Sequence, residues 1–261
     1  MLIYPQLTTG ALTQYGVVKM RQERTIQNTL ADGSVITVAD PAGSAVHWGL
    51  HYTSLSDTER QTLEQFFSAA EGTLNGFTFL DPSANLLAWS EDLSNAVWSA
   101  GPQLALTGGI QAPRGGASAW QLSNTSGGNQ GLTQVLNVPV IYTYTFSVYL
   151  RATEATSATL LLGSASAAVT VASAWKRYQI AGSGNATETY VTVGVNLPAG
   201  AVVSLFGPQA EAQQTASVYQ TSTNGGVYQN ARLESDCLTV TTTGVNRHSA
   251  TVKILYYANN L

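Results

Sequence analysis

The chain has 261 residues, a formal net charge of −4 and only 10% charged residues. This length suits one large domain or two modest ones, and the charged fraction lies well below the roughly 25% of an average globular protein. A surface so poor in charge favours coverage by partners. The negative balance and the lack of any run of like charges argue against direct binding of DNA or RNA.

Cys237 is the single cysteine, which excludes an intramolecular disulfide framework and fits folding in a reducing compartment. Since it lies in the strand-like segment "DCLTVTTT", we expect a buried small side chain rather than a catalytic thiol. The N-terminus lacks the basic and long apolar parts of a secretory signal. Apolar runs such as 201–206 are too short to span a bilayer. We expect a soluble chain that is neither exported by the usual signal route nor inserted into a membrane.

Residues 12–52 alternate apolar and polar side chains with a period of two. Asp32-Gly33 stands between two alternating runs, which is a strong signal for a hairpin turn. This stretch predicts three or four antiparallel strands.

The period changes between Ser56 and Glu71, where apolar residues recur with helical spacing. Ser56 and Glu59 form the pattern of a capping box, and Gly72 supplies a left-handed stop. The helical face predicted to be buried consists of Leu63, Phe66, Phe67 and Ala70.

A further strand is predicted from Gly76 to Leu80, and Pro82 ends it because proline cannot donate to a sheet ladder. Residues 86–220 differ from the preceding part in their sequence pattern, because short apolar runs alternate with turns rich in Gly, Ser, Asn and Pro. This regular spacing indicates a β-sandwich of the jelly-roll kind without a long helix. The predicted strands are "QLALTG", "GLTQVLNV", "YTYTFSVYLRA", "ATLLLGS", "AAVTVAS", "WKRYQIAG", "TYVTVGVNL" and "AVVSLFGPQ".

The last part predicts three strands, "VYQNARLES", "DCLTVTTTG" and "NRHSATVKILYYA". In the third, Ala250, Val252, Ile254 and Tyr256 alternate with the residues between them. Three short strands need a partner sheet, which the strands before Pro82 can provide. We therefore expect a mainly β protein with a split domain, residues 1–84 plus 222–261. This small β-barrel or sandwich with one helix would be interrupted by an inserted jelly-roll β-sandwich, residues 85–221.

Few residues suggest chemistry. His47 and His51 share a strand face, but no third metal ligand lies nearby in sequence and His248 is only a spatial candidate, so we expect a solvated face. Glu91-Asp92 is an adjacent carboxylate pair, whereas glycosidase carboxylates face each other across the sugar. A turn or helix-start role is therefore expected for this pair.

Nucleotide-binding and hydrolase motifs are absent from the sequence, namely a Walker loop, a dinucleotide fingerprint, H-E-x-x-H and G-x-S-x-G. The glycine pairs at 108–109, 115–116 and 127–128 are expected in loops. No cofactor, metal or catalytic residue is predicted.

Aromatic residues of the middle segment can stack on sugars, but we expect most of them to lie in the core. Trp98 and Trp175 are expected at strand starts, and Tyr142 is expected to share one strand face with Tyr144 and Phe146. The aromatic candidates are Trp89, Trp98, Trp120, Trp175, Tyr142, Tyr144 and Tyr190.

The order of these signals resembles a known family. "LHYTSLSDTERQTLEQFFSAAEGTLNGFTFLDP" looks like part of the distal tail or minor tail proteins of long-tailed bacteriophages, and "DCLTVTTTGVNRHSATVKILYYANN" resembles the strand pair that closes the same small domain. The middle is similar to carbohydrate-binding-module-like sandwiches of phage tail and other virion proteins. It opens with "NLLAWSEDLSNAVWSA" and closes with "VSLFGPQAEAQQTASVYQTST".

The resemblance implies a structural virion protein at the tail tip, assembled in the cytoplasm of the host bacterium. Its copies would form a ring, a hexamer by analogy, that joins the tail tube protein to baseplate hub or tail fibre proteins. The inserted module would project outward, and its contact with host-surface glycans during host attachment is left open, with the carbohydrate-binding residues unknown. A ring would also hide edge strands and apolar patches.

Two other hypotheses remain. The chain is a carbohydrate-binding protein without a ring-forming role, or it is a tail-associated glycan-degrading enzyme. We expect no enzymatic activity, because the sequence offers no identifiable pair of catalytic carboxylates.

Overall fold

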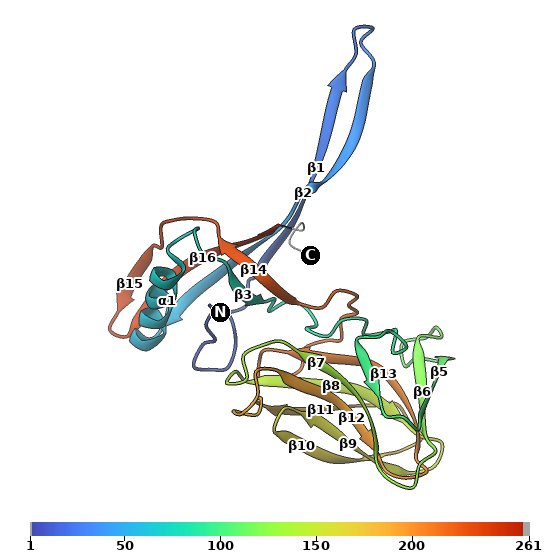
Figure 1. Cartoon of the computed structure of the whole chain (residues 1–261). Helices are drawn as coiled ribbons and strands as arrows, with labels where there is room; N and C mark the ends of the chain where they lie inside the picture. Colours follow the sequence, from blue (N-terminus) through green and yellow to red (C-terminus); the bar gives the residue numbers. More distant parts are fainter. Residues whose placement is uncertain (1, 258–261) are drawn as a thin grey trace. The chain divides into compact units, whose positions relative to one another are not determined.

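The computed structural model describes residues 2–257, which form two compact units. The first unit comprises residues 2–8, 12–79 and 228–257, and the second comprises residues 9–11 and 80–227. Ala258, the end of the last expected strand, lies outside the described residues. The domain boundaries expected from the sequence stay a prediction, and each unit is treated by itself below (Figure 1).

The first unit is built on one six-stranded sheet in the order β1-β2-β16-β14-β3, with β15 paired to β16. Its strands are β1 (Val18–Thr29), β2 (Val35–Leu55), β3 (Phe77–Leu80), β14 (Val227–Leu233), β15 (Val240–Gly244) and β16 (Arg247–Tyr257). Strands from both ends of the chain therefore share one sheet, because β16 pairs along β2. The alternation expected in the last strand is confirmed, since Ala250, Val252, Ile254 and Tyr256 are all buried.

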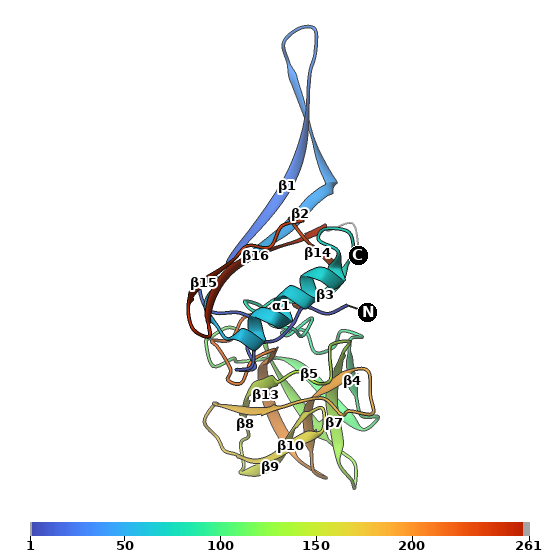
Figure 2. The same ribbon diagram turned by 90° about the vertical axis from the view of Figure 1, so that its left-hand side faces the viewer.

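A long hairpin replaces the three or four strands expected over residues 12–52, and that prediction was wrong. The turn lies at Asp32-Gly33 as expected, with the Asp32 carboxylate accepting from Ser34 and Gly33 at a φ of +84°. Beyond it, β2 does not break at residues 41–44 but passes through an irregularity opposite Glu23. Arg24 pairs with Asp40 there, which keeps the strands together. The hairpin extends beyond the helix-covered part of its sheet (Figures 1 and 2).

The predicted helix is confirmed as α1 (Asp57–Ala70), with Ser56 as N-cap and the complete capping box. Glu71 and Gly72 both adopt the left-handed conformation at its end. Leu63, Phe66 and Ala70 are buried in a cluster with core residues such as Trp48, Tyr52 and Phe77. The helix thus covers one face of the sheet, and packing rather than intrinsic propensity provides most of its stability.

Glu59 also receives hydrogen bonds from the backbone and hydroxyl of Thr8. Burial acts to raise the pKa of Glu59, but the hydrogen bonds from Ser56 and Thr8 outweigh it and leave that pKa below its usual value. A lowered folded-state pKa means that the capping box stabilises the fold above the unfolded pKa of about 4.3. That contribution is lost as pH falls through the folded-state value.

Replacing Ser56 by alanine removes the acceptor for the Glu59 backbone N–H. We expect a loss of about 1 kcal/mol, which corresponds to roughly fivefold faster hydrogen exchange across residues 57–70. Ser68→Ala, at an exposed position of the same helix, is the control and should leave exchange nearly unchanged. Equal exchange in the two variants would contradict the assigned cap.

The second unit is a β-sandwich of two five-stranded sheets (Figure 1). The first sheet has the order β10-β9-β12-β7-β4 and the second has the order β11-β8-β13-β6-β5. Each of the eight predicted runs contains a strand, β4 begins at Trp98 where a strand start was expected, and one further strand, β6, was not predicted. The strands are β4 (Trp98–Ala100), β5 (Leu104–Ile110), β6 (Ala119–Asn124), β7 (Gln130–Leu136), β8 (Tyr144–Arg151), β9 (Thr156–Leu162), β10 (Ala165–Val171), β11 (Lys176–Gly182), β12 (Val191–Leu197) and β13 (Val202–Glu211).

Two local predictions for the sandwich were wrong, one for a glycine pair and one for Tyr142. Gly108 and Gly109 lie within β5, at a register shift between Thr107 and Ile110, rather than in a loop. Gly109 has a φ of +82°, which a bulge commonly requires and glycine tolerates. Tyr142 precedes β8 and does not share its regular alternation with Tyr144 and Phe146.

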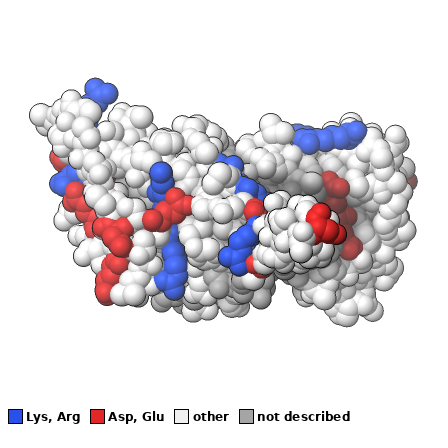
Figure 3. All heavy atoms as spheres, turned by 90° about the horizontal axis from the view of Figure 1, so that it is seen from above, with Lys and Arg blue, Asp and Glu red and all other residues white. Residues whose placement is uncertain are grey.

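The chain is therefore mainly β, and α1 is the one α-helix among the described residues. No helix in this part of the chain is long and apolar enough to cross a bilayer. Charged residues are sparse on the molecular surface, and wide areas of the view in Figure 3 carry none. This agrees with the low charged fraction of the sequence.

Candidate ligand-binding face

One sheet of the sandwich has an outer face rich in polar and aromatic side chains. Along β8, Phe146, Val148 and Leu150 are fully buried toward the opposing sheet. The alternate residues, including Ser147, Tyr149 and Arg151, point to the other side because successive strand residues face opposite ways. We call this side the outer face of the β11-β8-β13-β6-β5 sheet.

A row of hydrogen-bonding side chains crosses this outer face. Arg151 pairs with Ser204, Ser204 pairs with Gln121, and Gln121 pairs with Thr107. Directly paired residues of antiparallel strands point to the same side, so these side chains form one line. With strands about 4.8 Å apart, the line is about 14 Å long. We call it the polar row: Thr107, Gln121, Ser204 and Arg151.

The side chains of the polar row make no hydrogen bond or ion pair with any described residue. Ser204 is only 9% exposed and still has no hydrogen-bond partner. The Ser204 hydroxyl is not one of the fully buried side-chain atoms that lack a partner, so it remains accessible from outside. The row therefore offers donors and acceptors that the fold itself does not use.

Aromatic side chains border the polar row. The Arg151 guanidinium lies 4.8 Å from the centroid of the Trp175 ring. Trp175 packs with Tyr149 against a buried cluster that contains Phe206 and Tyr219. The row thus ends beside a partly buried indole, which supplies apolar surface next to polar groups.

The neighbouring part of the outer face is closed by the chain after β13. Arg177 lies over the Tyr149 ring and donates to the Ser147 hydroxyl and the Ser217 carbonyl. Glu211 accepts from Gln209 and from the Ser217 backbone N–H. The terminal nitrogens of Arg177 and the Glu211 carboxylate thus have partners within the fold, whereas Arg177 Nε and the Trp175 indole N–H are buried without one.

Tyr219 is a buried member of the aromatic cluster. Its hydroxyl shares a hydrogen bond with Ser90 and donates to Glu91. Burial, the largest cause, raises the pKa of Tyr219 to about 12, and the nearby Glu91 charge acts in the same direction. The phenol therefore stays protonated near neutral pH and adds no negative charge to this side of the sandwich.

The opposite sheet has a plain outer face. Its outward strand residues are small, hydroxyl-bearing or aliphatic, such as Thr133, Thr192 and Leu161, with Asn196 as the one amide. No charged or aromatic strand residue lies there. The combination of a polar row, an indole and arginines thus distinguishes one outer face of the sandwich from the other.

The histidines considered as metal ligands do not come together. His47 contacts Glu234 and Gln22, and His51 contacts Thr251. The described residues contain no group of three or more His, Cys, Asp and Glu arranged to hold a metal ion. His51 is exposed, as expected, whereas His47 is partly covered by its contact with Glu234.

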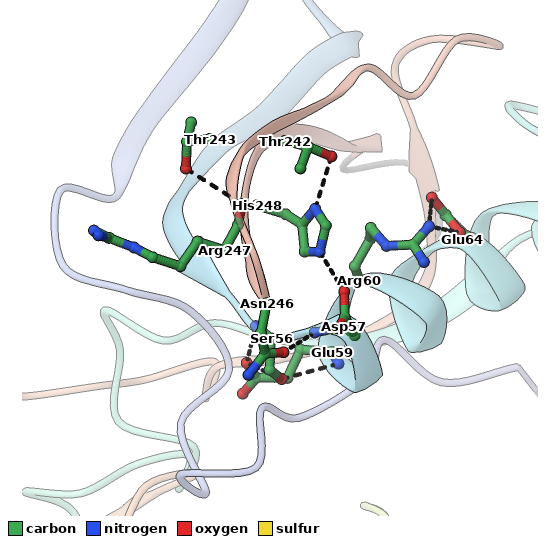
Figure 4. A network of polar contacts seen from close by, with 10 residues as sticks. All are labelled: Ser56, Asp57, Glu59, Arg60, Glu64, Thr242, Thr243, Asn246, Arg247 and His248. Carbon is green, nitrogen blue, oxygen red and sulfur yellow. Dashed lines mark hydrogen bonds and ion pairs between the residues drawn. The ribbon is translucent and has the colours of Figure 1, made fainter.

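His248 is the centre of a separate network in the first unit (Figure 4). Its Nε2 lies 2.7 Å from the Asp57 carboxylate, and its Nδ1 lies 3.0 Å from the Thr242 hydroxyl. The order carboxylate, imidazole, hydroxyl resembles that of acyl-transfer triads. The imidazole is buried, however, and Asn246 accepts from the Asp57 backbone in the same network. These bonds hold the start of α1 against the β15–β16 hairpin, and we assign them that structural role.

Cys237 is exposed, so the expectation of a buried thiol was wrong. It lies in the loop before β15 rather than in a strand, since β15 begins only at Val240. The loop borders a cavity of about 540 Å³ whose lining also includes His51 and Lys253. The cavity lies where β14 and β15 pair with different parts of the same edge of β16.

Glu91 and Asp92 have the structural roles expected of them. Asp92 accepts from the backbone and hydroxyl of Ser94, which forms a turn. The Glu91 carbonyl accepts from the Trp120 indole 2.9 Å away.

Of the aromatic candidates, Trp98 and Tyr144 are buried as expected, and Trp89 is exposed with a φ of +50°. Trp175 is not part of the core between the sheets, contrary to expectation.

Sequence reasoning did not identify the polar row. Its four members lie in four different strands, and β6, which carries Gln121, was not predicted. The one available signal was Arg151, a rare charged residue of the middle segment that directly follows an alternating apolar run.

Comparisons with known proteins find likeness in structure only. No family model matches the sequence, and no curated protein is similar to it in sequence. The family 22 carbohydrate-binding module of Clostridium thermocellum Xyn10B aligns with a TM-score of 0.42 and 16% identity, over 53% of this chain and 100% of the module. The module TmCBM61, solved with β-1,4-galactotriose, aligns with a TM-score of 0.39 and 16% identity, over 49% of this chain and 98% of the module.

A phage protein is also among the similar structures. The enzymatically active domain of bacteriophage CBA120 tailspike protein 4 aligns with a TM-score of 0.39 and 14% identity. The match covers 50% of this chain and 22% of that one. These likenesses concern carbohydrate-binding-module-like β-sandwiches and give no information about which residues bind a ligand.

If the polar row serves a ligand rather than the fold, its loss should not affect stability. We expect Ser204→Ala and Gln121→Ala to change the free energy of unfolding by less than about 0.5 kcal/mol, because neither side chain has a partner. Gln209→Ala, on the same strand as Ser204, should cost about 2 kcal/mol, because that side chain is buried and hydrogen-bonded. Chemical denaturation checks this, and a large loss at Ser204 or Gln121 would assign the row to the fold.

Proposed function

We propose that the β-sandwich binds a glycan along the polar row. The observation that carries this proposal is the line of Thr107, Gln121, Ser204 and Arg151, whose side chains make no hydrogen bond or ion pair among the described residues. All four side chains can donate, and the hydroxyls and the amide can also accept, so a ligand that satisfies the whole row both accepts and donates hydrogen bonds. Sugar hydroxyls meet this requirement along a chain.

The shape of the face also suits an extended ligand. The row follows the direction across the strands, so its groups repeat at the strand spacing of about 4.8 Å. Trp175 adds partly buried apolar surface at one end of the row. Binding sites commonly combine such an aromatic surface with a few polar groups beside it.

Replacing Gln121 by alanine should weaken glycan binding about fivefold, since one net hydrogen bond contributes about 1 kcal/mol. The matched control is Asn196→Ala, which removes an amide from the outer face of the opposite sheet. A glycan array followed by titration calorimetry on a retained glycan measures the difference. Equal weakening by both substitutions, or by neither, would contradict the proposed location.

A second role rests on the hairpin formed by β1 and β2, whose two faces differ in character. Ile26 pairs with Val38 and Asn28 pairs with Ile36, so these side chains share one face. The side chains of Ile26, Ile36 and Val38 are 44–50% exposed. Gln27 pairs with Thr37 on the other face, where Val35 and Ala39 are the apolar exceptions.

We propose that this hairpin joins copies of the chain into the ring that the resemblance to phage distal tail proteins implies. Exposed apolar residues on an unpaired hairpin are an aggregation hazard unless a partner covers them. Copies related head to tail would cover them and close into a ring. The tail tube protein and the hub or fibre proteins are the further partners that this role implies, and the tail tip of the virion is the place.

The double substitution Ile36→Asp with Val38→Asp should convert a ring to monomers, because it places two charges on the apolar face of the hairpin. Thr37→Asp, between them but on the opposite face, should leave the ring intact. Native mass spectrometry gives the subunit number directly. A wild-type chain that stays monomeric would favour a carbohydrate-binding protein without a ring-forming role, and polysaccharide depolymerisation by the purified chain would favour an enzyme.

A further inference from the structure

The positive charges of the sandwich are concentrated on the side that carries the polar row. Residues 80–227 contain only four basic side chains, Arg114, Arg151, Lys176 and Arg177. Arg151 and Arg177 belong to the outer face of the β11-β8-β13-β6-β5 sheet, and Arg114 lies 5.6 Å from the Tyr219 ring of the cluster on that face. Lys176 alternates with Arg177 and so leaves β11 on the other side.

None of these four cations has a carboxylate partner. Every ion pair among the described residues lies in the first unit, for example Arg60 with Glu64. In the sandwich the arginines lie over aromatic rings instead, with Arg177 5.6 Å from Tyr149. Ring stacking does not neutralise a guanidinium, so each of these arginines keeps its positive charge.

Arg151 differs from the other two arginines. Arg114 donates to the Tyr219 carbonyl, and Arg177 donates to Ser217 and Ser147. The Arg151 guanidinium stacks on the Trp175 ring and makes no hydrogen bond or ion pair among the described residues. A guanidinium that stacks by its plane keeps its edge N–H donors available, and that edge matches a carboxylate or sulfate in two parallel hydrogen bonds.

The acidic residues near this face are already occupied. Glu211 accepts from Gln209, Gln213 and Ser217, and Glu91 accepts from Tyr219. The polar row itself contains no carboxylate. Neither carboxylate forms an ion pair with Arg151, so a negatively charged ligand group can pair with this guanidinium without displacing a carboxylate of the fold.

We propose that the glycan is acidic and that Arg151 binds its carboxylate or sulfate group at one end of the polar row. This inference rests on the proposed glycan-binding function and specifies the chemical class of the ligand. Gln121, Ser204 and Thr107 would then bind the hydroxyls of the neighbouring sugars. A nucleic acid is the less favoured anion, because the sandwich has only four basic residues and the whole chain carries a net charge of −4.

The test is an array with the full-length chain over neutral, uronate-bearing, sialate-bearing and sulfated oligosaccharides, with a single-stranded oligonucleotide included. We expect retention of acid-bearing glycans that weakens as salt rises above about 0.15 M. Arg151→Gln should reduce their affinity at least about tenfold, since a charge-assisted bidentate contact is lost. Lys176→Gln, the same charge change at a residue that leaves the opposite side of its strand, should stay within about twofold of wild type.

The outcomes separate the two proposals. Retention of neutral glycans, unaffected by Arg151→Gln, would overturn the acidic class and leave glycan binding in place. Retention of no glycan would overturn both. Retention of the oligonucleotide in place of glycans, or equal losses in the Arg151 and Lys176 variants, would also contradict the assignment. The uronate and sulfate spots distinguish the two anionic groups.

Discussion

The register of three neighbouring strands decides what the sandwich presents to a ligand. Because β13 pairs with β8 on one side and with β6 on the other, Arg151, Ser204 and Gln121 lie side by side. A slip of one residue would turn each of these side chains inward and bring core residues such as Val203 and Leu150 to the surface. The same alternation that builds the apolar core therefore builds the polar row, and burial of the core fixes the position of the row.

Low charge is the second constraint. A β protein with few charged residues lacks the usual protection of its strand edges and apolar patches. The long hairpin with three exposed aliphatic residues on one face is the most evident such patch in the first unit. Assembly through the hairpin and ligand binding by the sandwich are separate proposals that rest on different residues.

Local signals in the sequence predicted the local structure well. Ser56 and Glu59 predicted the helix start, because a capping box depends on residues three apart. Residues 250–256 predicted a half-buried strand through simple alternation. The sequence failed where non-local contacts decide. The Arg24–Asp40 pair lies where β2 continues instead of dividing into the separate strands that were expected. Strand β6 was missed because its short run of mixed residues owes its strand form to neighbours on both sides. The polar row depends on three cross-strand pairings, which no single segment reveals.

The most direct measurement of the central claim is a backbone and side-chain NMR titration of the isotope-labelled full chain with an array-retained glycan. The account predicts shift changes concentrated at Thr107, Gln121, Ser204 and Arg151 and at the Trp175 indole, with residues such as Thr133 and Asn196 unaffected. Shift changes centred on the opposite sheet, or none at a glycan concentration that saturates the array, would contradict it.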